Sequence, residues 1–196
     1  MRLHVGNGSV LLRNWVNIDL PLPNIFLVKE RPDLAEKFMT TEDDYYGRHK
    51  DKNPDKWRKG AIVQETVTDC YGSFGFLPVR NGSVEEIWSV QSFEHLGKEE
   101  ARAAVSECSR ALKSGGFLRL DVPDPDATIR EYRKTGDEWL FRHLFGPRLD
   151  VYGGHTYYNR AMLKSVVEKG GLFKYVAEEP NIHENYPAFC LRFRRI

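Results

Sequence analysis

The chain has 196 residues, and its 29 lysine and arginine residues nearly balance 28 aspartate and glutamate residues, for a formal net charge of +1. A composition that is 41% hydrophobic and 29% charged is typical of a globular protein and excludes a mainly disordered chain. The length favours one domain over residues 1–196, and the near-neutral charge disfavours a dedicated nucleic-acid binder.

Membrane insertion and secretion are not expected. No apolar run approaches the roughly 18 residues that a membrane-spanning helix needs, and the first residues lack the pattern of a signal peptide. The three cysteines, Cys70, Cys108 and Cys190, are far apart in the sequence and form neither a disulfide framework nor a CxxC metal site. We therefore expect a cytoplasmic protein without a membrane partner.

Two short strands are predicted near the start of the chain, over residues 3–5 and 15–18, because both are rich in β-formers and bounded by turn residues. The linker between them, residues 6–14, is too short for a full crossover helix. A charged segment follows at residues 28–60, where about half of the residues are charged. It has two interpretations: a solvated insertion, helical over residues 32–38, or a lid over a ligand.

From residue 61 onward, predicted strands and helices alternate. Strands are expected over residues 61–69, 84–90 and 117–122, helices over 97–114, 124–134, 139–145 and 159–169, and a closing strand pair over 174–179 and 188–194. Gly115 and Gly116 are expected to end a helix, and Asp124 to cap the next one. The alternation predicts an α/β fold with a mainly parallel sheet, and the closing pair, which no helix joins, predicts an antiparallel last strand.

Glycines and polar residues follow each predicted strand. In open α/β sheets ligands bind at the carboxyl ends of the strands, so these residues are expected to meet at one edge. They are Gly6, Asn7 and Gly8, then Asp19, then Asp69, then Gln91, Ser92, Glu94 and His95, and finally Asp124. Glycines let the backbone approach a ligand, Asp19 suits a ribose diol, and Asp69 suits the amino group of adenine. Each residue also has a purely structural interpretation, as a turn, a strand end or a helix cap.

The glycine pattern does not fit a dinucleotide site. The fingerprint GxGxxG needs a third glycine where this chain has Leu11, and its acidic residue lies about 20 residues further on, whereas Asp19 follows Gly8 by only 11. The helix that would hold a pyrophosphate is also missing. This favours a ligand with adenosine and no phosphates, and disfavours an enzyme that binds NAD or a nucleotide sugar.

These segments resemble class I S-adenosylmethionine-dependent methyltransferases, and in particular their small type 11-like branch. The resemblance rests on residues 3–8 (LHVGNG), 15–19 (WVNID), 84–96 (VEEIWSVQSFEHL) and 107–123 (ECSRALKSGGFLRLDVP). It covers the chain up to about residue 125, apart from the charged segment. It implies a Rossmann-like three-layer sandwich with an antiparallel last strand, S-adenosyl-L-methionine as cofactor, and methyl transfer as the reaction.

The resemblance also implies roles for particular residues. Gly6 and Gly8, with Asn7 between them, would pass under the methionine part and the ribose, and Asp19 would bind the ribose hydroxyls. Asp69 and Cys70 would lie at the adenine, and Gln91 and Ser92 beside the methionine moiety and the substrate.

The chain departs from the family pattern at three positions. Asn7 replaces a cysteine or small residue, and Asn14 replaces a glycine, although asparagine can still adopt a left-handed conformation. Related quinone O-methyltransferases carry an ExxEH metal motif, and here Glu94 and His95 match while Gln91 stands at the first position. An amide is a poor substitute for a carboxylate on a hard cation, so no metal is predicted.

The expected chemistry is in-line displacement at a sulfonium methyl group, and an oxygen acceptor would also have to lose a proton. His95 is the first candidate base and His155 the second, because histidine titrates in the right range. Residues 91–94 do not match the segment of adenine and cytosine N-methylases, so the expected acceptor is a small molecule or a glycan, methylated at oxygen. The alternative is a degenerate methyltransferase that binds S-adenosylmethionine or S-adenosylhomocysteine as an interaction module; Asn7 and the short first linker motivate it.

Overall fold

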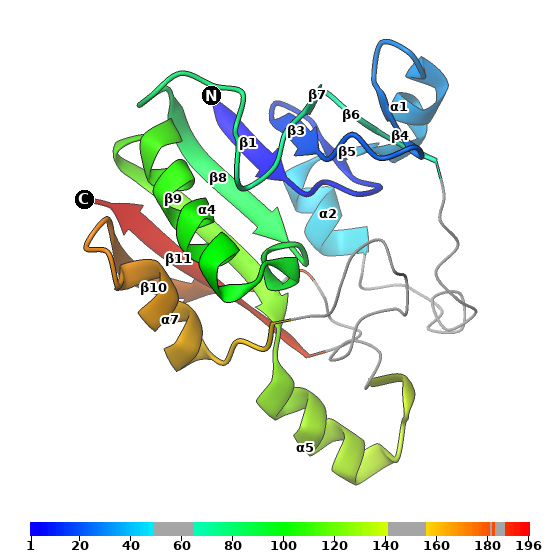
Figure 1. Ribbon diagram of the computed structural model, residues 1–196. Coiled ribbons are helices and arrows are strands. Elements are labelled where there is room, and N and C mark those ends of the chain that lie inside the picture. Colours follow the sequence, from blue (N-terminus) through cyan, green and yellow to red (C-terminus); the bar gives the residue numbers. More distant parts are fainter. Residues whose placement is uncertain (49–64, 141–155, 181, 183–186) are drawn as a thin grey trace.

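A seven-stranded sheet forms the centre of the computed structural model, which describes residues 1–48, 65–140, 156–180, 182 and 187–196 (Figure 1). Its strand order is β10-β11-β9-β8-β1-β3-β7. The strands are β1 (Arg2–Val5), β3 (Val16–Asp19), β7 (Cys70–Tyr71), β8 (Val84–Val90), β9 (Leu112–Pro123), β10 (Phe173–Glu179) and β11 (Ala188–Arg195). Only β11 runs against its neighbours; the other pairs in this sheet are parallel. The mainly parallel sheet with an antiparallel last strand is thus confirmed.

Helices cover both faces of the sheet, which gives the predicted three layers (Figure 1). On one face α4 (Lys98–Ala111) and α7 (Arg160–Glu168) pack on the larger apolar core. On the other face lies α2 (Glu42–Arg48), while α5 (Pro125–Thr135) leads away from the end of β9. Within the described ranges, no helix is both long and apolar enough to cross a membrane.

The first crossover, from β1 to β3, contains no helix, as the length of the linker predicts. It holds instead the two-residue strand β2 (Leu11–Leu12), which pairs with β5 (Met39–Thr40). Asn14 has a positive φ of 66°, so asparagine does adopt the left-handed conformation expected there. The cover for this face of β1 therefore comes from a later part of the chain.

That cover is α2, within the charged segment. Tyr45 on α2 is only 5% exposed, and its ring lies 5.7 Å from that of Trp88 on β8 and 6.1 Å from that of His4 on β1. Glu42 forms an ion pair of 2.7 Å with the buried Arg119 on β9. The helix α1 (Pro32–Phe38), predicted at these bounds, buries Phe38 in a small apolar cluster of its own. Residues 28–48 are thus packed on the body of the protein; residues 49–60 lie outside the described residues.

Several element boundaries differ from the prediction. The helix predicted to reach residue 114 ends at Ala111, and the chain enters β9 at once. Gly115 and Gly116 therefore do not end the helix. They lie inside β9, where a Cβ on Gly116 would come within 3.0 Å of the Glu85 carbonyl oxygen on β8. Glycine at position 116 therefore allows β9 to pass close to β8.

The strand predicted over residues 61–69 is β6 (Thr66–Thr68), which pairs with β4 (Ile25–Leu27); residues 61–64 lie outside the described residues. Asp69 directly follows β6, as predicted, but the chain then continues into β7, whose Tyr71 pairs with Asp19. The helix caps were predicted correctly. Asp124 Oδ1 accepts a hydrogen bond from Ala127 N (2.9 Å), and Asn159 Oδ1 accepts one from Met162 N (2.9 Å).

The last strand was expected to have one buried face. Phe189, Leu191 and Phe193 are buried as predicted, but Cys190 is fully buried as well. The reason is the position of β11 between β9 and β10, where both sheet faces are covered along the first half of the strand. The predicted helix at residues 139–145 lies largely outside the described residues.

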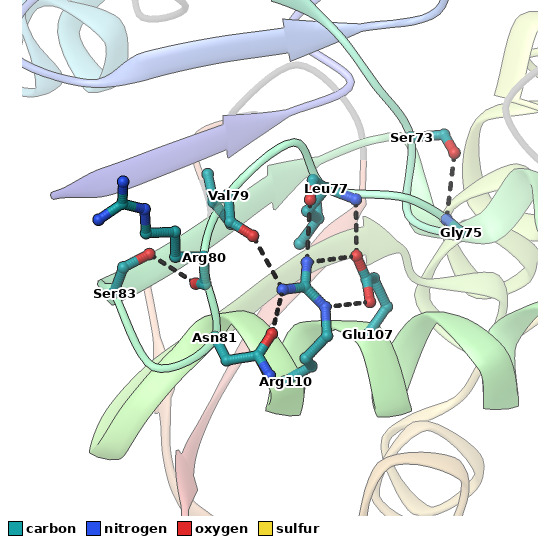
Figure 2. A network of polar contacts seen from close by, with 9 residues as sticks. All are labelled: Ser73, Gly75, Leu77, Val79, Arg80, Asn81, Ser83, Glu107 and Arg110. Carbon is teal, nitrogen blue, oxygen red and sulfur yellow. Dashed lines mark hydrogen bonds and ion pairs between the residues drawn. The ribbon is translucent and has the colours of Figure 1, made fainter.

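The loop between β7 and β8 is fastened to α4 by Arg110 (Figure 2). The Arg110 guanidinium donates to the carbonyl oxygens of Leu77 (2.9 Å) and Val79 (2.8 Å) and to Asn81 Oδ1 (2.7 Å). Glu107 accepts two further hydrogen bonds from Arg110 and one from the backbone N–H of Leu77. This network fixes the path by which the chain returns from the edge of the sheet.

Candidate cofactor and acceptor site

The carboxyl ends of β1 and β8 meet at Gly6 and Ser92. Gly6 has a φ of +71°, and a Cβ on it would overlap the Ser92 hydroxyl and lie 2.5 Å from Ser92 Cβ. The backbone N–H of Gly6 donates to the Ile18 carbonyl oxygen on β3 (2.8 Å). Gly8 also has a positive φ, of +51°, but a Cβ there would meet no atom within 4 Å. The first glycine thus permits a close contact, and the second leaves open space beside the edge.

Asp19, the last residue of β3, is joined to the same loop. Its Oδ2 accepts a hydrogen bond from Gly8 N (2.8 Å), and its Oδ1 accepts one from Leu20 N (2.8 Å). Burial raises the pKa of the carboxyl, and the two backbone hydrogen bonds act against that rise. Because each carboxylate oxygen can accept more than one hydrogen bond, both can still bind a diol.

Asn7 turns its side chain away from this contact and into the protein. It is 3% exposed, and its Nδ2 donates to the carbonyl oxygens of Val67 and Gly8, both at 3.0 Å. Its Oδ1 has no hydrogen-bond partner. The side chain that replaces the family's small residue therefore ties the first loop to β6.

Asp69 and Cys70 lie further back from the edge than the strand prediction implied. Asp69 Oδ2 accepts hydrogen bonds from the backbone N–H and the side-chain Nδ2 of Asn17, both at 2.8 Å. Cys70 pairs with Ile18, and burial and the Asp69 charge raise the pKa of its thiol. This places Asp69 two residues before the level of Asp19.

Tyr71 and Gly72 stand level with Asp19 instead. Tyr71 is its partner in the β3–β7 register, and the backbone N–H of Gly72 donates to the Asp19 carbonyl oxygen (2.9 Å). Sequence analysis missed both residues. The available signal was Gly72, a glycine three residues after the predicted strand. It lies where a close approach requires glycine, because a Cβ on it would come within 2.9 Å of the Ile18 side chain.

Gln91 connects the end of β8 to the end of β9. It adopts a left-handed conformation, with φ of +52°, and its Nε2 donates to Asp121 Oδ1 (2.9 Å). Asp121 is fully buried, and burial raises its pKa to about 7. Non-glycine residues held at positive φ cost energy and cluster at functional sites. Asp121 was not singled out from the sequence, because an acid inside a predicted buried strand gives no sign of which group it meets.

A short 3-10 helix, η1 (Phe93–His95), follows Ser92. Glu94 in this turn is 2% exposed, and its Oε2 has no hydrogen-bond partner. Burial, with a contribution from the Asp121 charge, raises the pKa of Glu94 to about 8. His95 is half-buried beside it. His155 lies outside the described residues, but the next residue, Thr156, donates from its backbone N–H to the Glu94 carbonyl oxygen (2.7 Å).

The structure thus brings Gly6, Gly8, Asp19, Gln91 and Ser92 to one edge of the sheet. Glu94 and His95 continue from that edge, whereas Asp69 and the side chain of Asn7 are engaged elsewhere. Within the parts of the chain that the structure describes, no three His, Cys, Asp or Glu residues gather as a metal site would require.

Comparison with known proteins identifies this arrangement. The model of the methyltransferase domain family matches residues 40–120. A methyltransferase of Haloferax volcanii, solved in complex with the Trm112 methyltransferase activator, has a TM-score of 0.56 at 13% identity, covering 99% of this chain and 81% of that one. A S-adenosylmethionine-dependent methyltransferase of Methanosarcina mazei has a TM-score of 0.54 at 13% identity, covering 100% and 92%.

A third similar structure concerns the conversion of a disulfide bond into a thioacetal group during echinomycin biosynthesis. It has a TM-score of 0.53 at 11% identity, and the match covers 99% of this chain and 74% of that one. No curated protein matches the chain in sequence.

The sheet order and the three layers are those of a Rossmann-like fold of the class I methyltransferase type, as the sequence motifs predicted. The matched methyltransferase-domain model agrees with that fold. The residues at the edge fit S-adenosylmethionine, the cofactor that the sequence motifs imply, since Gly8 borders open space and Asp19 offers acceptors for a diol.

Proposed function

We propose that this protein transfers a methyl group from S-adenosylmethionine to a hydroxyl oxygen of a small molecule or a glycan. The observation that carries the proposal is the convergence of Gly6, Asp19 and Ser92 at one edge of the sheet. The crossover after β1 has no helix, so it offers no helix N-terminus of the kind that binds a pyrophosphate. A donor with adenosine and no phosphates fits this edge better than a dinucleotide.

Each edge residue has a role in this proposal. The backbone at Gly6 and Gly8 runs beneath the methionine part and the ribose, and the Asp19 carboxylate accepts hydrogen bonds from the ribose hydroxyls. Gln91 and Ser92 lie beside the methionine part and the acceptor. The bound donor supplies an activated methyl group, so the protein's main task is to align the acceptor oxygen with it.

The adenine is proposed to lie at the end of β7, the strand that pairs with β3 beside Asp19. Asp69 and Cys70 remain the residues proposed there from the sequence motifs, and Tyr71 and Gly72 stand closer to Asp19. Residues 1–196 are taken as one methyltransferase-like domain. His95 and His155 remain the bases proposed from the sequence.

Two observations support a small acceptor. A similar fold is found in a protein that was solved in work on the conversion of a disulfide bond into a thioacetal group during echinomycin biosynthesis. The net charge of +1 gives the chain no general attraction for a polyanion. The three cysteines are free thiols, as suits a cytoplasmic location.

The second candidate is a cofactor-binding module that acts through a partner protein. Two observations favour it: the first crossover lacks its helix, and the Haloferax volcanii neighbour was solved with an activator protein. In this case the chain would bind S-adenosylhomocysteine but transfer no methyl group by itself.

Calorimetric titration with S-adenosylhomocysteine, with NAD and a UDP-sugar as controls, tests the site that both candidates share. Methyl transfer from radiolabelled S-adenosylmethionine to panels of phenols, alcohols, sugars and amines then separates them. Binding with transfer to hydroxyl acceptors supports the enzyme, and binding without transfer to any panel member supports the module. Binding of NAD in preference to S-adenosylhomocysteine would overturn the proposed site.

A further inference from the structure

Glu94 is a buried carboxyl with an unused oxygen. Its side chain is 2% exposed, and Oε2 has no hydrogen-bond partner. An unpaired polar atom in the interior costs free energy, and buried polar atoms in native proteins are paired in the large majority of cases. Other buried polar atoms of the described residues also lack a partner, but Glu94 Oε2 is the carboxylate oxygen among them, and so it can take up a proton from a ligand.

The groups around Glu94 do not neutralise it. Asp121 on β9 is a second buried acid, and its negative charge raises the pKa of Glu94 by repulsion. The ring of Tyr158 packs against Phe93 of η1, 5.8 Å between centroids, and burial, with a smaller contribution from the Glu94 charge, raises the pKa of its phenol. His95 is the neighbouring residue in η1.

The nearest buried cation, Arg119 on β9, has other partners. Its guanidinium pairs with Glu42 at 2.7 Å and Glu179 at 2.8 Å. Over the described ranges of the chain, no ion pair includes Glu94 or Asp121. Glu94 therefore has no ion-pair partner within these ranges, whereas the Arg119 charge acts on Asp121 and opposes the rise of its pKa.

The pair adjoins the edge where the donor is proposed to bind. Ser92, two residues before Glu94, touches Gly6, and Gln91, the residue before Ser92, holds Asp121 through its side chain. Thr156 fastens η1 from the other side, by its backbone N–H to Glu94 and by its hydroxyl to the Leu96 carbonyl oxygen (2.7 Å). Backbone hydrogen bonds thus hold Glu94 in place beside the site, while its Oε2 atom accepts no hydrogen bond.

We propose that Glu94 is the proton acceptor of the methyl transfer and that it takes this role only when the donor is bound. This inference rests on the proposed function. In the transfer, a bond forms between the acceptor oxygen and the methyl carbon, the carbon–sulfur bond breaks with its electron pair left on sulfur, and the acceptor proton passes to the Glu94 carboxylate. Product release leaves Glu94 protonated, and this proton is lost to water when the next donor binds.

The acid–base properties of Glu94 agree with this role. Its pKa of about 8 keeps it protonated in the empty site, and a base works best when its pKa lies near the operating pH. An opposite charge within about 4–6 Å lowers a carboxyl pKa by about 1–3 units. The base would therefore become active only when the donor is bound.

Proton release on cofactor binding tests the inference without any acceptor. Calorimetric titrations at pH 7.5 in buffers of different ionisation enthalpy give the number of protons released with S-adenosylmethionine and with S-adenosylhomocysteine. The second ligand lacks the sulfonium charge, so the difference between them reports that charge alone. For the wild-type protein we expect about 0.6 more protons released with S-adenosylmethionine, because a group of pKa about 8 is largely protonated at this pH.

Glu94→Gln is the decisive variant, because glutamine closely matches the size of the neutral carboxyl and should leave the fold intact. We expect the difference in proton release to fall at least threefold while S-adenosylhomocysteine affinity stays within about twofold. Glu86→Gln is the matched control, because Glu86 is a partly buried acid of raised pKa toward the other end of β8. It should release as many protons as the wild type.

The outcomes distinguish a failure of the role proposed for Glu94 from a failure of the proposed function. Equal proton release with both ligands in the wild type, or unchanged release in Glu94→Gln, overturns the role of Glu94 and leaves the proposed function standing. Absence of binding by either ligand overturns the proposed function itself.

Discussion

Gly6→Ala tests the contact on which the proposed site depends. The new methyl group would overlap the Ser92 hydroxyl and lie 2.5 Å from Ser92 Cβ, and alanine would have to hold a φ of +71°. A left-handed conformation costs a non-glycine residue about 1–2 kcal/mol, and an added group in a packed site costs about 1–3 kcal/mol more. We expect Gly6→Ala to lower the free energy of unfolding by about 3 kcal/mol and to abolish measurable S-adenosylhomocysteine binding.

The neighbouring glycine supplies the control. Gly8→Ala has the same kind of conformational cost, but its Cβ meets no atom within 4 Å, so we expect a loss of only about 1 kcal/mol. Ser92→Gly removes both atoms that the Gly6→Ala methyl group overlaps, and the double variant should recover the steric part of the loss. Urea unfolding followed by circular dichroism measures these four variants and the wild type. Equal losses at the two glycines, or no recovery in the double variant, would refute the close contact.

Three further predictions concern separate parts of the chain. Asp19→Ala should weaken S-adenosylhomocysteine binding by about 1.5–3 kcal/mol, because a ribose hydroxyl pair loses a charged acceptor; unchanged affinity in calorimetry would remove Asp19 from the site. Glu94 has a folded pKa of about 8, above its unfolded value, so its contribution to stability is complete below about pH 4.5 and is lost as pH rises toward 8. The unfolding free energy of the wild type relative to Glu94→Gln should therefore fall over that range in urea titrations, and parallel pH profiles would contradict the burial of a neutral carboxyl. Tyr45→Ala should cost about 3–5 kcal/mol in thermal or urea unfolding, because it opens a cavity against Trp88, whereas a cost below about 1 kcal/mol would show that α2 is a loosely held lid.

Much of the framework could be predicted because local chemistry determines it. Asp124 and Asn159 are residues whose side chains accept hydrogen bonds from free backbone N–H groups, and both cap the helices predicted for them. Alternating strands and helices led to the parallel sheet, and Gly6, Asp19 and Ser92 were expected at its edge because strand ends meet there. These features depend on short stretches of sequence and on one general rule of sheet topology.

The remainder depended on register and burial, which a single sequence does not specify. Asp69 was expected after a strand and directly follows β6, but a second short strand, β7, comes next, and Tyr71 of β7 takes the place beside Asp19. Gly115 has the residue type of a helix end, yet it lies inside β9. The structural interpretation of Glu94 was a helix N-cap next to a packed His95. The burial of its side chain was not foreseen, because no neighbouring residue in the sequence indicates it.

The origin of the α2 cover has a consequence for the behaviour of the protein in acid. His4 is fully buried beneath Tyr45 and Trp88, its pKa is lowered to about 4 by burial, and its Nε2 has no hydrogen-bond partner. In water the same imidazole takes up a proton near pH 6.5. Acidification from about pH 6.5 toward 4 therefore favours any state in which α2 has lifted away and His4 is hydrated. The packing of α2 over the first strand, β1, is therefore expected to weaken when His4 takes up a proton.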